Sequence, residues 1–293
     1  MRLLKGLDRE VTRRHGSVMS SMPSIAIVAL LLAAPLACTA RPAPGSLPLP
    51  AAARDSLAAE LRRSWRDELL TPWYPRAVDR ERGGFLSRFD ADWNAVGDQD
   101  KMIVAQARHV WTNARAAQFF GDTAHRAWAR HGFHFLRDAM WDREHGGFYW
   151  LVSRDGMPRT EADGRTPKQA YGNAFAIYAL AAYYDATRDS AALRLAQDAF
   201  RWLEAHAHDP EHGGYFNHLE RDGTPMRAGF RGDPPKDQNS SIHLLEAFAE
   251  LYRRYVDPVH DFLTRMLRNR DEAADVTQDA FVRAMQALPK LRQ

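Results

Sequence analysis

The stretch that decides the fold occurs three times, as DRERGGF at residues 79–85, DREHGGF at 142–148 and DPEHGGY at 209–215. The first glycines of these heptapeptides lie 63 and then 67 residues apart. Paired glycines let the backbone take positive φ, and the aromatic residue after them begins a short extended arm. An Arg-Asp-Gly turn follows the second and third copies, at 154–156 and 221–223. The regular spacing predicts a structural repeat.

Helices are predicted between the heptapeptides, because apolar residues recur there every three or four positions. After the first copy, for example, the residues Val104, Ala107, Trp111 and Ala114 form one apolar face. We predict helices at about 55–70, 98–120, 123–139, 167–186, 189–207 and 236–255. Each repeat is then two helices and a glycine-rich arm. Helical repeats of this length favour a solenoid or a closed toroid, in which each unit buries its apolar face against its neighbours.

The composition is that of a globular protein. Of the 293 residues, 45% are hydrophobic and 26% are charged, which excludes wholesale disorder and a polytopic membrane protein. The formal net charge is +3, but residues 1–22 carry five basic and two acidic side chains, so the remainder holds 35 of each sign. A chain that is neutral outside its first residues has no basic surface for nucleic acid, and we expect no nucleic-acid partner.

The basic start precedes the 13-residue apolar run IAIVALLLAAPLA at 25–37, which has the form of a secretory signal and is short for a membrane span. We predict a signal peptide at 1–37, a Pro/Ala-rich tether at 38–54 and an exported protein. The only cysteine, Cys38, resembles the lipid-modified cysteine of bacterial lipoproteins. A lipid anchor in the cell envelope and a plainly cleaved signal both stay open. One cysteine allows no intramolecular disulfide.

Three further stretches carry a family resemblance: KMIVAQARHVW (101–111), KQAYGNAFAIYALAAYYDATRD (168–189) and KDQNSSIHLLEAFAELYR (236–253). Interleaved with the glycine-rich arms, they resemble the N-acylglucosamine 2-epimerase and cellobiose 2-epimerase superfamily over about 55–255. The resemblance implies an all-α fold, the (α/α)6 barrel, with short glycine-rich β arms. Six hairpins of ~65 residues need roughly 390 residues. We therefore expect 55–255 to be the N-terminal half of such a barrel.

The sequence changes character after Tyr255. Residues 256–293 resemble the start of region 2 of extracytoplasmic-function sigma factors, where a DEAADVTQDAFVRA-type helix contacts RNA polymerase. A further helical hairpin of the barrel is the alternative. The segment from 257 carries six basic and six acidic residues, so it has no electrostatic footprint for DNA. An export signal also argues against a sigma-like, polymerase-binding function, because polymerase is cytoplasmic.

The resemblance implies a carbohydrate isomerase that epimerises a reducing mono- or disaccharide at carbon two, or interconverts aldose and ketose, through an enediolate and without a cofactor or metal. This chemistry needs a base, an acid on the opposite face and donors for the enediolate oxygen. The family supplies the acid and base as histidines, one in a later G-H-D-x-E-type motif and one near its C-terminus. This sequence contains neither. We expect the chain as written to be an incomplete, inactive epimerase.

Four polar residues are the main candidates for the site. Arg108 lies beside the apolar face of its helix, where a guanidinium needs a partner such as a sugar oxygen. Asn239 and His243 are four apart on one helix face, and Glu246 can reach the imidazole and orient it. The resemblance matches Arg108, Asn239 and His243 to substrate-contacting positions, with His243 as acid/base or polarising group. A structural arginine and a structural histidine are the alternatives.

Trp111 and Tyr171 are predicted to stack on a sugar ring, since sugars present apolar C–H faces to aromatic rings, with core packing as the alternative. Two other functions stay open. A glycoside hydrolase of the same toroid architecture would need two carboxylates, and Asp90, Asp92 and Glu246 are available without a spacing that singles out a pair. A non-catalytic carbohydrate-binding remnant is the other. The uncovered edge of a half barrel also predicts self-association.

Overall fold

The structure is a computed structural model and describes residues 50–251. The chain divides into two units, Met1–Ala58 and Ala59–Gln293. Helix α1 (Ala51–Ser64) begins in the first unit, and all three heptapeptides belong to the second. The predicted signal peptide, Cys38 and the sigma-like segment lie outside the described residues. No helix in the described part of the chain is long and apolar enough to cross a membrane.

The second unit consists of helical hairpins, as predicted. A π-helical turn η1 (Trp65–Leu70) leads into the short α2 (Thr71–Trp73). The remaining helices are α3 (Ile103–Phe120), α4 (Thr123–Phe135) continued by the π-helical η2 (Leu136–Met140), α5 (Ala170–Thr187), α6 (Ser190–His206) and one described over 238–251. The sequence analysis placed the starts of α3 and α5 several residues too early, because the residues just before both helices form short strands.

The two hairpins that are described in full turn in the same way. α3 ends at Gly121, which takes the left-handed conformation with φ 68°, and Asp122 caps α4 by accepting a hydrogen bond from the amide of Ala124. α5 ends at Arg188 with φ 59°, and Asp189 caps α6. Such a cap satisfies an amide that has no partner within the helix and stabilises it by about 1 kcal/mol. The turns bring each second helix back against the first.

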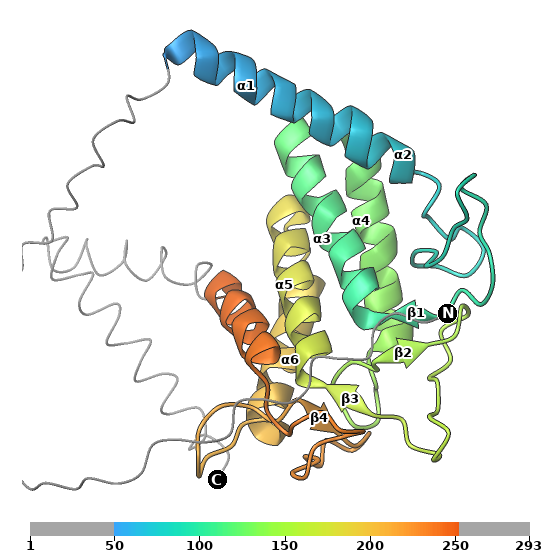
Figure 1. Cartoon of the computed structure of the whole chain (residues 1–293), viewed down its shortest axis with the longest axis vertical. Coiled ribbons are helices and arrows are strands. Elements are labelled where there is room, and N and C mark those ends of the chain that lie inside the picture. The colour runs from blue at the N-terminus through green and yellow to red at the C-terminus, as the bar shows by residue number, and fades with distance from the viewer. Residues whose placement is uncertain (1–49, 252–293) are drawn as a thin grey trace, which may run out of the picture. The chain divides into compact units, whose positions relative to one another are not determined.

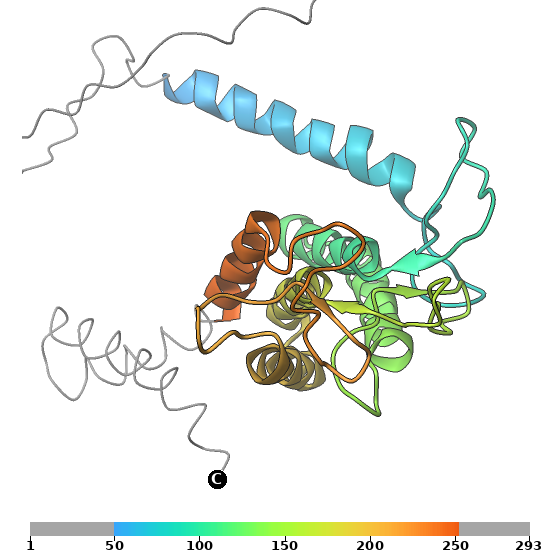
Figure 2. The ribbon, with the colours of Figure 1, turned by 60° about the horizontal axis from the view of Figure 1, so that its bottom comes forward.

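The helices form two layers. α3 packs against α5 and α4, and α5 packs against α6. Figures 1 and 2 show α3, α5 and the helix at 238–251 side by side, with α4 and α6 behind them. We call the layer of α3, α5 and 238–251 the inner layer. Alanines let α5 approach its neighbours closely, and aromatic side chains such as Phe133 and Tyr183, stacked at 4.7 Å, fill the space between the layers.

The arms gather at one end of the helices and connect successive repeats (Figure 1). Strand β1 (Lys101–Met102) pairs with β2 (Leu151–Val152), and β3 (Lys168–Gln169) pairs with β4 (His218–Leu219), both antiparallel. In each pair, the strand that begins an inner helix is joined to the arm of the following repeat. The heptapeptide loops themselves are closed by single bridges, such as Val78 with Phe85.

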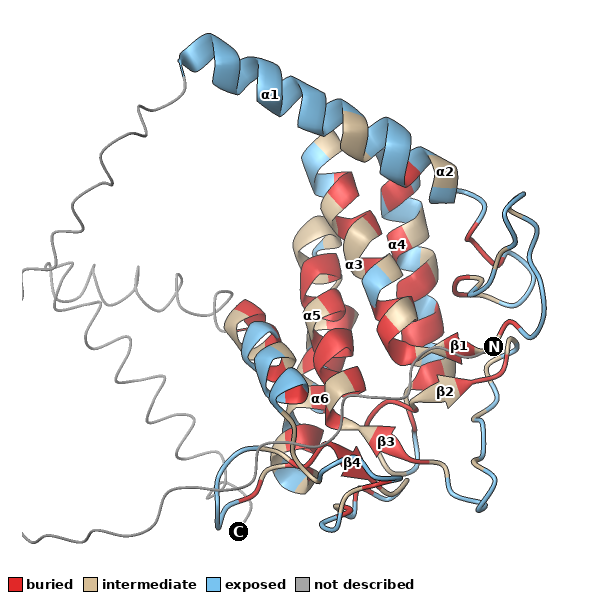
Figure 3. Ribbon diagram, viewed as in Figure 1, coloured by how far each residue is buried: buried red, intermediate tan, exposed pale blue. Residues whose placement is uncertain are grey.

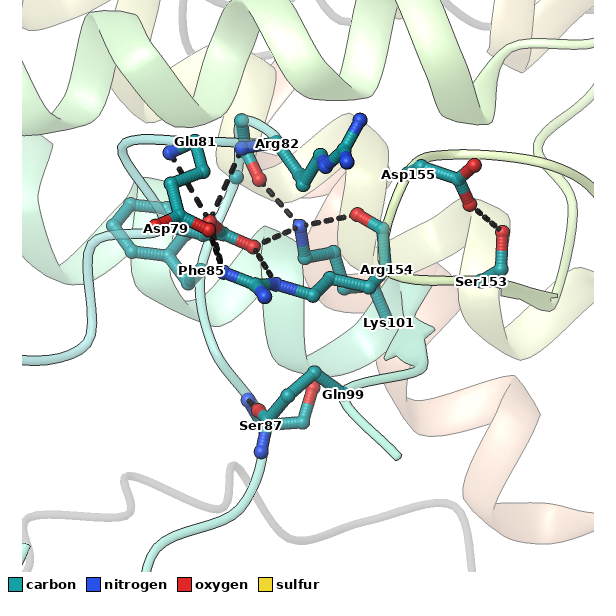
Figure 4. A network of polar contacts seen from close by, with 12 residues as sticks. Asp79, Glu81, Arg82, Phe85, Ser87, Gln99, Lys101, Ser153, Arg154 and Asp155 are labelled. Atoms are coloured by element: carbon teal, nitrogen blue, oxygen red, sulfur yellow. Dashed lines mark hydrogen bonds and ion pairs between the residues drawn. The ribbon is translucent and has the colours of Figure 1, made fainter. Parts of the chain in front are cut away.

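A buried polar cluster locks each of these connections. In cluster 1 (Asp79, Lys101, Arg154), the ammonium of Lys101 donates to Asp79 at 3.0 Å and to the backbone carbonyls of Gly83 and Arg154. The Arg154 guanidinium donates two hydrogen bonds, of 2.9 and 3.0 Å, to the same carboxylate (Figure 4). Asp79 also accepts from the amides of its own loop. Burial alone raises the pKa of Asp79, but the hydrogen bonds from Arg154 and Lys101 outweigh it and hold the pKa well below its usual value.

Cluster 2 (Asp142, Lys168, Arg221) repeats this arrangement in the next connection. Lys168 donates to Asp142 and to the carbonyls of Gly146 and Arg221, and Arg221 donates to Asp142. Burial, which raises the pKa of Asp142, is again outweighed by these two cations, so the carboxyl titrates well below its usual range. The lysines therefore mark equivalent positions in successive repeats.

Candidate functional site

Corresponding positions on the three inner helices can be found by counting along the sequence from a lysine. These lysines are Lys101 and Lys168 of clusters 1 and 2, and Lys236, which precedes the helix at 238–251. Positions three, seven and ten residues after Lys101, Lys168 and Lys236 stand in corresponding places on the three inner helices. These positions are Val104, Arg108 and Trp111 on α3, Tyr171, Phe175 and Tyr178 on α5, and Asn239, His243 and Glu246 on 238–251. All six residues predicted for the site belong to this set. We call the nine residues the inner face.

Arg108 and His243 meet at one aromatic ring. The guanidinium carbon of Arg108 lies 4.8 Å from the centre of the Phe175 ring, and the imidazole centre of His243 lies 4.5 Å from the same point. The two side chains come from the first and third inner helices and are brought together by the middle one. Because each group lies within 5 Å of the same ring centre, the two are close enough for a single sugar to contact both.

The imidazole of His243 is held in one orientation. Its Nδ1 lies 2.7 Å from Oε2 of Glu246, and the ring of Tyr171 packs against it at 5.2 Å, nearly perpendicular. An ionised carboxylate can only accept a hydrogen bond, so Nδ1 donates and Nε2 of the neutral ring keeps its lone pair. The His243 side chain is 21% exposed, which leaves it accessible from the inner face. This is the arrangement that a general base requires.

Two cavities open beside these residues. A cavity of about 700 Å³ is lined by Arg108, Trp111, Trp73 and other residues of α3 and the segment before it. A smaller cavity of about 280 Å³ is lined by Tyr171, Asn239 and the loop before the last described helix. Arg108 and Asn239 thus border different cavities. Phe175 contacts a residue of each lining, Arg108 of the larger cavity and Tyr171 of the smaller one.

The two aromatic candidates differ in their surroundings. Trp111 is half-buried and stacks on Tyr178 with ring centres 5.7 Å apart and an angle of 14°, so one of its faces is already covered. Tyr171 is half-buried, packs on Phe175 and His243, and lines the smaller cavity together with Trp150. Both aromatic candidates therefore border a cavity, Trp111 the larger one and Tyr171 the smaller one.

A second imidazole, that of His109, lies beside Arg108 in the sequence and lines the same cavity. His109 lines the larger cavity, but its ring stacks on Phe85 at 4.5 Å and its Nδ1 shares a hydrogen bond of 2.6 Å with the Tyr74 hydroxyl. Burial lowers the pKa of His109 to about 4, so the ring is neutral at physiological pH. Its partners make it a packing residue.

Two of the three carboxylates considered for glycoside hydrolysis, Asp90 and Glu246, have structural partners. Asp90 accepts hydrogen bonds from the amides of Asp92 and Asn94 and so fixes the turn of the first arm. Glu246 is bound to His243. Within residues 50–251, no group of three or more His, Cys, Asp or Glu side chains is placed to hold a metal ion.

The sequence analysis missed Phe175, the residue on which the site converges. A phenylalanine on an apolar helix is indistinguishable from core by composition. The signal that identifies it is its position seven residues after Lys168, because Arg108 and His243 stand seven residues after Lys101 and Lys236. Trp150 and Asn217, which line the smaller cavity, were also missed, since both come from arms distant in sequence.

Comparisons with known proteins find relatives of this chain in sequence and in fold. The chain is 32% identical to cellobiose 2-epimerases of Bacteroides fragilis, over 69% of this chain and 51% of the relative, and of Ruminococcus albus, over 67% and 50%. The structure of cellobiose 2-epimerase from Spirochaeta thermophila superposes with a TM-score of 0.62 and 33% identity, over 78% of this chain and 54% of that one. The chain thus spans about half the length of the relatives it matches.

The N-acylglucosamine 2-epimerase family model matches residues 83–284. That range contains the second and third heptapeptides, the inner face and much of the segment that resembles a sigma factor, whose own resemblance stays a prediction. The solved structure from Spirochaeta thermophila shares the helical-hairpin architecture. By its sequence match and its fold, this chain belongs to the N-acylglucosamine 2-epimerase family.

Proposed function

We propose that the chain provides the sugar-binding wall of a carbohydrate 2-epimerase and that turnover requires the part of the barrel its relatives have in addition. The observation that supports this most directly is the convergence of Arg108 and His243 on the ring of Phe175. A cation and an oriented imidazole that both contact one aromatic ring fit the open-chain form of a reducing sugar. The similarity to cellobiose 2-epimerases favours a reducing mono- or disaccharide as substrate.

The side chains divide the chemistry between them. Nε2 of His243, with Nδ1 held by Glu246, removes or returns the proton at carbon two. The guanidinium of Arg108 donates hydrogen bonds to the oxygen on which the enediolate charge develops, and such charge-assisted bonds are roughly twice as strong as neutral ones. Tyr171 offers its ring to the C–H face of the sugar. Asn239, from the smaller cavity, contacts a hydroxyl further along the substrate.

One half of a two-base mechanism is missing from this set. Epimerisation returns the proton to the opposite face of carbon two, so a second acid must stand across the sugar from His243. His109 is neutral and bound to Tyr74, and among the described residues no other histidine belongs to the inner face. A general acid or base accelerates a reaction roughly 10²–10⁴-fold, so the chain alone should epimerise sugars at a rate close to the uncatalysed one.

The test is isotope exchange at carbon two of cellobiose, mannose and N-acetylmannosamine in heavy water. The 293-residue chain is compared with the same chain supplemented by the remaining half of an epimerase. We expect sugar binding by both and exchange only by the supplemented protein. Equal exchange rates would show that the catalytic groups lie elsewhere in this chain. Binding without exchange in both samples would favour the alternative function, a non-catalytic carbohydrate-binding protein.

Export is part of the proposal and rests on residues 25–38 of the sequence. Expression of the full chain in a bacterium, followed by cell fractionation, tests it. A cleaved product in the periplasm or membrane supports export, and metabolic labelling with palmitate distinguishes a lipid anchor, which Cys38→Ser should abolish. Full-length protein confined to the cytoplasm would contradict it.

A further inference from the structure

A further polar cavity lies next to the smaller of the two cavities described above. It measures about 300 Å³, and we call it the outer cavity. Trp150 lines it and also lines the smaller cavity, beside Tyr171 and Asn239. The two cavities are therefore neighbours that share one aromatic residue. The polar residues of the outer cavity are Asp98, Asp100, Arg159, Thr160 and Glu161.

A succession of rings leads from His243 to the outer cavity. The ring centre of Tyr171 lies 5.2 Å from that of His243, and the ring centre of Trp150 lies 6.4 Å from that of Tyr171. Trp150 is held against α5, because a Cβ added to Gly172 would lie 3.2 Å from its ring. The C–H groups of successive sugar units can pack on aromatic rings that follow one another in this way.

The outer cavity depends on a loop that is longer than its counterpart in the first repeat. Nine residues, 159–167, connect the bridge of the second arm to β3, whereas five, 96–100, lead from the bridge of the first arm to β1. Figure 1 shows the longer segment as a loop that leaves β2 and returns to β3, and Figure 3 shows it exposed over most of its length. Exposed loops on a rigid scaffold commonly carry binding residues.

Two ion pairs tie the start of this loop to its surroundings. Arg159 donates hydrogen bonds of 2.9 and 2.6 Å to the two carboxylate oxygens of Asp100. Glu161 forms an ion pair of 2.7 Å with Arg231, which belongs to the loop that supplies Asp233 to the smaller cavity. These contacts fix the walls of the outer cavity relative to one another and to the smaller cavity.

The outer cavity also contains polar groups that are available to a ligand. In the described part of the chain, the carboxylate of Asp98 and the hydroxyl of Thr160 make no hydrogen bond or ion pair. Nη1 of Arg159 has no partner there either, since its ion pair uses Nε and Nη2. A sugar hydroxyl can donate to a carboxylate and accept from a guanidinium, so these groups suit a sugar.

The charges of the lining distinguish between kinds of sugar. Asp100 is paired with Arg159 and Glu161 with Arg231, which leaves the carboxylate of Asp98 without a cation among the described residues. An acidic sugar unit would be repelled by this carboxylate, whereas a neutral unit with several hydroxyls would not. The lining therefore favours a neutral sugar.

We propose that the outer cavity is a subsite for a neutral sugar unit of an oligosaccharide whose reducing end lies at His243. The ring of Tyr171 supports the units in between, the outer unit packs on Trp150, and its hydroxyls bind Asp98 and Thr160. The substrate class is thus a neutral oligosaccharide of three or more units. This inference rests on the proposed function, because that function places the reducing end at the inner face.

The test is calorimetric titration of the full chain with mannose, cellobiose, cellotriose and cellotetraose. We expect the affinity to rise by about 10-fold or more from cellobiose to the longer sugars, because the outer unit adds at least two hydrogen bonds. Equal affinity for cellobiose and both longer sugars would overturn the subsite and leave the proposed function intact. Failure of all four to bind would overturn both.

Variants locate the outer unit. Thr160→Val and Asp98→Ala should each weaken cellotetraose binding by about 2- to 10-fold and leave cellobiose binding unchanged. Both residues are exposed, so these variants are expected to fold, which circular dichroism checks. Trp150→Ala should weaken cellotetraose binding more than cellobiose binding. The matched control is Asp92→Ala, an exposed aspartate before β1 that lines neither cavity, and it should bind every sugar as the unaltered chain does.

The preference for a neutral unit has its own probe, cellotriose whose non-reducing glucose is oxidised to glucuronate. This acidic sugar should bind about 5-fold more weakly than cellotriose, and Asp98→Asn should remove most of that difference. Tighter binding of the acidic sugar, or variants of Asp98 and Thr160 that weaken cellobiose and cellotetraose equally, would overturn the proposal.

Discussion

Lys168 and Asp142 form an ion pair of 2.9 Å in which neither side chain is more than 1% exposed. The lysine uses all three of its donors, since Gly146 and Arg221 accept from it through their backbone carbonyls. Substitution Lys168→Met leaves the two carbonyls without this donor and the carboxylate with Arg221 as its remaining cation. Loss of one partner from a buried pair costs roughly 3–5 kcal/mol, and we expect that decrease in the free energy of unfolding measured in urea.

The matched variant is Lys236→Met, at the equivalent lysine of the third repeat, which donates to Asp209 and to the carbonyl of Gly213. Because Lys236 is 29% exposed and has one acceptor fewer among the described residues, its loss should cost clearly less. Equal decreases in the free energy of unfolding would contradict the expectation that the fully buried Lys168 stabilises the fold more than the partly exposed Lys236.

Acid should weaken the fold through the same carboxylates. Asp79 and Asp142 have pKa values held below the usual value by their arginine and lysine partners, against the opposing effect of burial. A group whose pKa is lower in the folded protein stabilises it above the unfolded pKa, about 3.9, and loses that contribution as pH falls further. We expect the urea midpoint to be steady from pH 7 to 5 and to fall below pH 4. A midpoint that stays constant down to pH 3 would exclude this contribution.

A methyl group on Gly147 should be poorly tolerated. Gly147 has φ 72°, and a Cβ there would lie 2.7 Å from the Trp202 ring. The left-handed backbone costs an L-residue about 1–2 kcal/mol, and overpacking adds typically 1–3 kcal/mol. Gly213 has nearly the same φ, 71°, with no atom within 4 Å of the added Cβ. Gly147→Ala should therefore lower the melting temperature more than Gly213→Ala, and the reverse order would contradict the Trp202 contact.

Arg108→Ala should reduce sugar affinity. The guanidinium is exposed toward the larger cavity, and a hydrogen bond to a charged group contributes about 1.5–3 kcal/mol, or roughly 10-fold or more in the dissociation constant. Calorimetric titration with cellobiose measures the change. Arg126→Ala, an exposed arginine of α4 in the other layer, is the control and should bind as the unaltered chain does. Unchanged affinity in Arg108→Ala would remove this residue from the site.

Glu246→Gln should slow the chemistry while leaving binding nearly intact. The amide can no longer fix Nδ1 of His243 as a donor, so Nε2 is available as a base for part of the time only. In the chain supplemented with the rest of the barrel, we expect exchange at carbon two to fall about 10-fold or more, within the contribution of a general base. A parallel loss of affinity would instead indicate that Glu246 contacts the sugar directly.

The hairpins could be predicted from sequence because their signals are local. Apolar periodicity marks the helices, and the aspartates at 122 and 189 mark where the second helices begin. The pairing of strands could not be predicted, since β1 joins an arm some fifty residues away. The site was predicted in part. Arg108, His243 and Glu246 were chosen by residue type and family resemblance and lie close together in the structure, whereas Phe175 stands out only through its two neighbours on other helices.

The order in which the residues of each buried cluster occur along the chain affects how the protein folds during synthesis. One of the two carbonyls that Lys101 and Lys168 each bind belongs to Arg154 and Arg221 respectively, 53 residues further along the chain. A repeat that has just left the ribosome therefore carries a lysine and an aspartate whose remaining partners have not yet been made. Each newly formed arm completes the repeat before it, so structure should become protected from the N-terminus onward, one repeat behind translation. The most recently made repeat is always the one most open to proteases and chaperones.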